Sequence, residues 1–117
     1  SLGTDHVTTT GEHRTLDLPD GTRVELGAAS ALDVEFNHST RLVKLRSGEA
    51  FFNVKSGDTR PFTVKAGGVS RKLQSECQLP PKVGFLPSSA SLATFSTLGC
   101  VSSPSTKGSR PHCRRPW

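Results

Sequence analysis

Apolar residues recur mostly at every second position between residues 12 and 66. This period of two is typical of strands that bury one face and expose the other. The runs are centred near residues 17, 24, 34, 44, 52 and 64, and the run at residues 41–45 is less regular, as expected of a strand that buries both faces in part. Short strands at this spacing predict an all-β fold, with antiparallel or solenoid-like strands arranged as a twisted β-solenoid or a sandwich.

Turn-forming residues separate these runs. In the strongest local signal, Pro19 presets φ for the first corner of a type I turn, Asp20 suits the second corner, and Gly21 takes the left-handed position. Ser47-Gly48 is expected to form a tight two-residue turn, and residues 56–58 a longer one. The pattern therefore predicts strands joined by short turns.

Four blocks of the first 67 residues resemble the FecR domain in their order and spacing: residues 15–26, 30–34, 45–54 and 60–67. Gly27-Ala28 departs from the family, in which an Asn usually follows the strand. The resemblance covers residues 5–67 and implies that the family-motif positions form structural turns and core. These positions are Leu18, Pro19, Asp20, Gly21, Val24, Leu26, Leu32, Gly48, Glu49, Ala50, Phe52, Val54, Pro61, Phe62 and Val64.

The resemblance also implies a signalling role. FecR-like proteins are anchored in the inner membrane of Gram-negative bacteria, and they sense a loaded TonB-dependent outer-membrane receptor through a periplasmic region. They pass the signal to a sigma factor that controls iron-siderophore uptake genes. The first implied partner is thus the signalling domain of such a receptor. The second is the sigma factor, which the parent protein contacts through parts absent from this chain. The resemblance does not identify the docking surface. The alternative is a generic β-rich module with no signalling role, which either is structural or binds a protein or a carbohydrate.

Composition changes abruptly after Gly68. Residues 1–68 hold 8 Lys and Arg against 9 Asp and Glu, whereas residues 69–117 hold 7 against 1. The second segment is rich in Ser, Pro and Arg, and it lacks the Ala-Leu-Gly-Thr block with which the family continues. We therefore expect a partial FecR-like β domain over residues 5–68 and a largely irregular tail over residues 69–117, with weak strands only near 83–86 and 92–95.

Two origins of the tail stay open. The loss of acidic residues and the break inside the family pattern favour a shifted-frame translation of a FecR reading frame, and the competing interpretation is a native, lineage-specific disordered tail. The coding DNA decides between them, because a shifted frame requires that an alternative frame after Gly68 restores the missing block.

The residue types needed for catalysis or metal binding are not suitably spaced. Cys77, Cys100 and Cys113 lack the close pairing of a structural zinc site, and their disulfide state is left open. His6, His13 and His38 are expected to be solvated, and Asp17, Asp20, Glu25, Asp33, Glu35 and Glu49 are expected on strand exteriors and turns beside basic residues. The sequence thus predicts no enzyme activity, cofactor or metal.

Two further partner classes are disfavoured. Phe85, Phe95 and Trp117 are not interleaved with the basic residues of the tail, so nucleic-acid binding is not expected. The chain shows no apolar run long enough to span a membrane and no signal segment, so a membrane is expected to contact the parent protein only through an anchor helix missing from this chain. An isolated half of such a domain leaves open strand edges, which predicts marginal stability or self-association.

Overall fold

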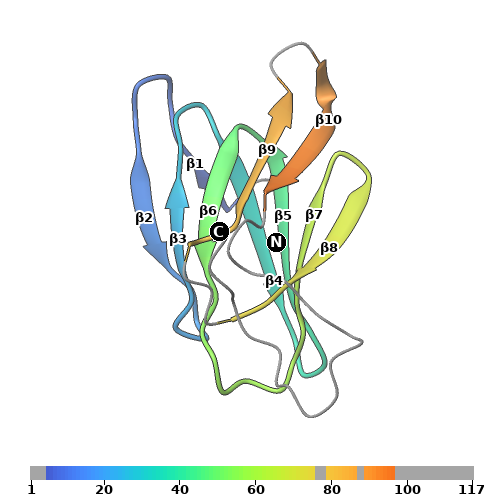
Figure 1. Cartoon of the computed structure of the whole chain (residues 1–117). Helices are drawn as coiled ribbons and strands as arrows, with labels where there is room; N and C mark the ends of the chain where they lie inside the picture. Colours follow the sequence, from blue (N-terminus) through green and yellow to red (C-terminus); the bar gives the residue numbers. More distant parts are fainter. Residues whose placement is uncertain (1–4, 76–78, 87–88, 97–117) are drawn as a thin grey trace.

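The computed structural model describes residues 5–75, 79–86 and 89–96, which form ten β-strands and no helix (Figure 1). Sheet A contains, in spatial order, β1 (His6–Val7), β4 (Ala31–Phe36), β5 (Arg41–Ser47), β7 (Phe62–Ala66) and β8 (Val69–Leu73). Sheet B contains β2 (Arg14–Asp17), β3 (Arg23–Leu26), β6 (Glu49–Asn53), β9 (Lys82–Leu86) and β10 (Ser89–Ser96). The predicted all-β class is confirmed.

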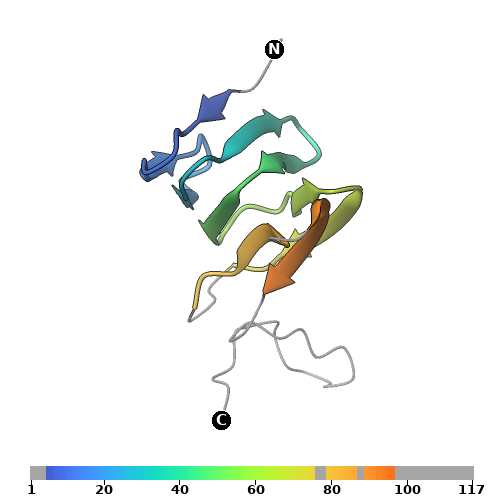
Figure 2. The same ribbon diagram turned by 90° about the horizontal axis from the view of Figure 1, so that it is seen from above.

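Strand order in each sheet follows chain order, so the chain advances from β1 at one end of the molecule to β9 and β10 at the other (Figure 2). Neighbouring strands are antiparallel, except that β5 and β7 run parallel because β6 crosses to sheet B between them. The two sheets share one core, which corresponds to the sandwich among the predicted arrangements.

The core is built from the residues that the alternation of apolar and polar positions predicted to face inward. In β3, Val24 and Leu26 are 0% and 1% exposed, and they lie opposite Phe52 and Ala50 of β6. The Phe52 ring meets Phe62 of sheet A with centroids 5.9 Å apart in an edge-on arrangement, which favours aromatic packing across the two layers. A shift of register by one residue would move each of these side chains to solvent, so the pairing is strongly specified.

The connection at Ser47-Gly48 differs from the predicted two-residue turn. β5 ends at Ser47 in sheet A and β6 begins at Glu49 in sheet B, so Gly48 is a corner between the sheets rather than a hairpin turn. Gly48 has a φ of +81°, a conformation that glycine adopts without steric cost. Turn residues signal a change of direction, and they do not reveal which sheet the next strand joins.

The sheets extend beyond the boundary that the sequence placed at Gly68. Gly67 and Gly68 form the turn of the β7–β8 hairpin, and Val83 of β9 is 0% exposed opposite Ala50. The strands expected near 83–86 and 92–95 are present as β9 and β10, whereas β8 was not anticipated because four of its five residues are exposed and show no alternation. Residues 97–117, with Cys100, Cys113 and Trp117, lie outside the described residues, as does Cys77.

Candidate protein-docking site

A buried ion pair fixes the turn between β2 and β3. Arg41 Nη1 lies 2.7 Å from Asp20 Oδ2, and the two side chains are 5% and 0% exposed. Asp20 belongs to a turn of sheet B, whereas Arg41 begins β5 of sheet A, so this pair joins the two sheets. Asp20 lies in a turn beside a basic residue, as expected, but the packing of the two sheets buries this pair instead of leaving it exposed.

Further hydrogen bonds complete the surroundings of this pair. Thr22 donates to Asp20 through its backbone N–H at 2.9 Å and through Oγ1 at 2.6 Å. Arg41 also donates to the carbonyls of Arg60 and Lys55, at 2.9 and 3.2 Å. The N–H of Lys55 donates to Thr22 Oγ1 at 3.0 Å, so the β6–β7 connection also contacts this cluster. Buried charges are tolerated only with such partners, so the motif Asp acts as a scaffold residue.

The same contacts set the titration of Asp20. Burial raises the pKa of its carboxyl, but the hydrogen bonds from Thr22 and the Arg41 guanidinium outweigh burial and hold the pKa below its ordinary value of 3.8. A carboxyl with a lowered folded-state pKa stabilises the fold above its unfolded-state pKa and loses that contribution as the pH falls through the folded-state value.

We therefore expect an Asp20→Asn variant to have a lower unfolding free energy than the unaltered chain. This difference should be largest near neutral pH and should shrink below pH 3.8. Urea unfolding at a series of pH values measures this difference. Asp17→Asn is the control, because the Asp17–Arg23 pair is 67% and 59% exposed and contributes little. An Asp20 difference that stays constant into the acid range would contradict the assigned role.

A second polar cluster forms the corner at Gly48. The N–H of Glu49 donates to Ser30 Oγ at 2.9 Å, and Ser30 Oγ lies 3.1 Å from the Glu49 carbonyl oxygen, to which it can donate. The Glu49 side chain covers two glycines, because a Cβ on Gly27 would stand 2.7 Å from Glu49 Cγ and one on Gly84 3.3 Å from Glu49 Cβ. A side chain at position 27 would therefore require the Glu49 side chain to move.

The family-motif positions lie in the scaffold. The apolar ones are buried between the sheets: Leu18, Val24, Leu26, Leu32, Ala50, Phe52, Val54, Phe62 and Val64. The others occupy turns and corners: Pro19, Asp20, Gly21, Gly48, Glu49 and Pro61. No group of three or more His, Cys, Asp or Glu side chains in the described part of the chain is arranged to hold a metal. Most of the motif therefore builds the framework of the domain.

The outer face of sheet A is basic. Lys44 of β5 pairs in register with Lys65 of β7, and both face outward because their neighbours Val43, Leu45 and Val64 are buried. Arg46 and Lys72 lie on the same face, two residues further along β5 and on β8. We call Lys44, Arg46, Lys65 and Lys72 the basic face.

Three carboxylates share this face. Asp33 is buried beneath Arg46, where its Oδ2 accepts a hydrogen bond from Arg46 Nε and its Oδ1 accepts the Asp5 N–H at 2.8 Å. Glu35 lies 3.2 Å from Lys44 Nζ. Asp33 thus lies on the outer face beside a basic residue, as expected, but it is covered and not exposed, while Glu35 forms an exposed cross-strand pair as expected. Asp5, whose Oδ2 accepts the Val34 N–H at 2.9 Å, is a third carboxylate beside Asp33, so four cations face three partnered carboxylates.

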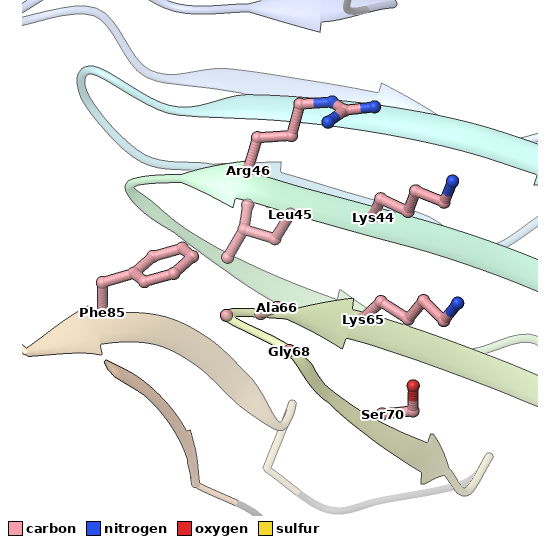
Figure 3. A pocket seen from close by; sticks show the side chains of 9 residues that line it. Lys44, Leu45, Arg46, Lys65, Ala66, Gly68, Ser70 and Phe85 are labelled. Atoms are coloured by element: carbon pink, nitrogen blue, oxygen red, sulfur yellow. The ribbon is translucent and has the colours of Figure 1, made fainter. Parts of the chain in front are cut away.

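A hollow of about 410 Å³ opens at one end of the basic face (Figure 3). Lys44, Lys65 and Ser70 point to the same side of the sheet in this view, whereas Leu45 and Phe85 line the opposite side. The alternation in the sequence predicts that Lys44 and Lys65 face outward. It does not predict that they pair, because β5 and β7 are separated in the chain by a strand of the other sheet.

Comparison with known proteins agrees with the fold. The family described as FecR protein matches residues 4–75. Two crystal structures of a proposed anti-sigma factor from Parabacteroides distasonis ATCC 8503, at 2.50 and 1.65 Å resolution, are similar to this chain, each with a TM-score of 0.62 and 32% sequence identity. Each match covers 72% of this chain but only 38% and 39% of the other chain, so this chain spans about two fifths of those proteins. No curated protein matches the sequence.

Proposed function

Because this chain belongs to the FecR protein family, we propose that it is a protein-binding domain of a sigma-factor regulator. The match over residues 4–75 carries this proposal, since it spans strands from both sheets and includes both buried polar clusters. The similar Parabacteroides protein, a proposed anti-sigma factor, supports a regulatory rather than an enzymatic role.

The framework suits a relay that works by docking. Apart from Glu49, which forms a partly exposed ion pair with Lys82, the motif residues form core, turns and the buried Asp20–Arg41 pair, and they leave the outer face of sheet A and the edge strands β8 and β10 for partners. Exposed edges and flat sheet faces are surfaces that other proteins use for strand addition or side-chain contact. In the described residues no helix is long and apolar enough to cross a bilayer.

In this proposal the parent protein works at the periplasmic face of the inner membrane. The domain binds the signalling domain of a TonB-dependent outer-membrane receptor, and the parent transmits that event to a sigma factor that controls iron uptake. Residues 5–68, extended by strands β8 to β10, form the docking unit.

Size-exclusion chromatography tests this proposal. The chain mixed with the signalling domain of a TonB-dependent receptor from the same genome is expected to elute as a complex, while the same domain mixed with an unrelated β-sandwich elutes separately. Separate elution with every receptor signalling domain of that genome would refute the proposed partner.

A further inference from the structure

The basic face holds a pair of like charges in direct register. Lys44 and Lys65 lie opposite each other across the parallel β5–β7 pair, and their side chains extend side by side (Figure 3). Like charges directly opposite on one sheet face destabilise the pairing. Lys44 is offset by Glu35, but no acidic side chain among the described residues pairs with Lys65. An anion at this position would relieve the repulsion.

The two outer faces of the molecule differ in charge. Besides the partnered carboxylates of Asp5, Asp33 and Glu35, the sheet A face presents four cations, with Lys65 and Lys72 free of ion pairs in the described part of the chain. The sheet B face carries Arg23 and Lys82 against Asp17, Glu25 and Glu49. An acidic partner is therefore attracted to sheet A and not to sheet B.

The spacing of the basic residues matches an extended peptide segment. The hollow borders the Gly67-Gly68 turn and Ser70, while Leu45 and Ala66 beneath it are only 2% and 3% exposed. Lys44 and Arg46 are two residues apart on β5, a separation of about 6.8 Å. Alternate residues of another extended chain have the same spacing.

We propose that the basic face and its hollow bind an extended acidic segment of a partner protein. Acidic residues at alternate positions contact Lys44, Arg46 and Lys65, and a neighbouring residue of the segment lies against Ser70 and the Gly67-Gly68 turn at the rim of the hollow. This inference deepens the proposed function, since it names the docking surface and the chemistry of the partner segment.

Fluorescence polarisation with a labelled peptide tests the proposal. The probe alternates Glu and Thr around one Phe, and the control probe has Gln in place of each Glu. The Glu probe is expected to bind, and binding should weaken at least tenfold in a Lys44→Glu/Lys65→Glu variant of the chain. Raising the salt concentration from about 0.1 to about 1 M should weaken it similarly, because the screening length falls from about 10 to about 3 Å.

A matched variant separates the site from overall charge. Lys55→Glu reverses one exposed lysine on the β6–β7 connection and is compared with Lys65→Glu alone, which changes the net charge by the same amount. Lys55→Glu should leave the affinity within about twofold, whereas Lys65→Glu should weaken binding. Thermal melting of each variant confirms that it folds. Equal binding of the Gln probe, unchanged affinity in the double variant, or binding of phosphatidylglycerol vesicles without binding of the peptide would each overturn the proposal.

The double variant also distinguishes this inference from the proposed function. If a receptor signalling domain binds the unaltered chain and the double variant equally well, the relay role stands and the docking face is wrong. If no receptor signalling domain binds either chain while the Glu probe binds only the unaltered one, the basic face stands and the receptor is the wrong partner.

Discussion

Replacing Gly48 by alanine is expected to destabilise the fold by roughly 4 kcal/mol, combining a strained left-handed backbone with a steric clash. Gly48 has a φ of +81°, and a Cβ at this position would stand 2.5 Å from Ser30 Cα and 2.6 Å from Ser30 Cβ. Since a small domain is stable by about 5–15 kcal/mol in total, this loss is a large fraction of the stability and should lower the urea midpoint of unfolding strongly. Urea unfolding followed by far-ultraviolet circular dichroism measures the loss.

Gly57 offers the matched control for this prediction. Its φ of +92° resembles that of Gly48, but a Cβ there would meet nothing within 4 Å. Gly57→Ala therefore carries the backbone strain alone, about 1–2 kcal/mol. Equal losses in the two variants would show that Ser30 does not crowd Gly48, and the corner between the sheets would then be wrongly placed.

Replacing Asp20 by alanine is expected to cost about 3–5 kcal/mol, because it leaves the Arg41 guanidinium buried without its carboxylate. The Arg41 side chain is only 5% exposed, and β5 holds it in place through the hydrogen bond from its backbone N–H to the Pro61 carbonyl at 2.9 Å. The unfolding free energy from urea titration gives the magnitude.

A double-mutant cycle isolates the ion pair from other contacts. Asp20→Ala, Arg41→Met and the double variant should give a coupling energy of at least about 1 kcal/mol, since the two groups interact directly. Asp17→Ala, which removes the exposed partner of Arg23, should cost no more than about 1 kcal/mol. Additive effects of the two changes at Asp20 and Arg41 would contradict a direct buried contact.

The strands from β2 to β7 could be predicted because each buries alternate residues. Val24 and Leu26, or Phe62 and Val64, are apolar on the same side of a strand, and burial on one face is the physical cause of that pattern. The β2–β3 hairpin was also predictable: the N–H of Gly21 donates to the Leu18 carbonyl at 2.9 Å, as the turn residues suggest. Local rules thus account for most individual elements.

Long-range pairing was not predictable from one sequence. Asp20 and Arg41 are charged residues of ordinary appearance, and only the packing of one sheet on the other removes both from water. Similarly, β8 shows no apolar period, because it is an edge strand with only Leu73 buried. The basic face also depends on long-range strand pairing, since Lys44 lies beside Lys65 only because β6 crosses to the other sheet.

A nuclear magnetic resonance titration tests the central claim most directly. The isotope-labelled chain is titrated with the signalling domain of a TonB-dependent receptor from the same genome, and backbone amide shifts are followed. The account predicts saturable shifts concentrated on β5, β7 and β8 around Lys44, Lys65 and Ser70, with the outer face of sheet B unchanged. The absence of any saturable shift with every such receptor domain of that genome, or shifts confined to sheet B, would contradict it.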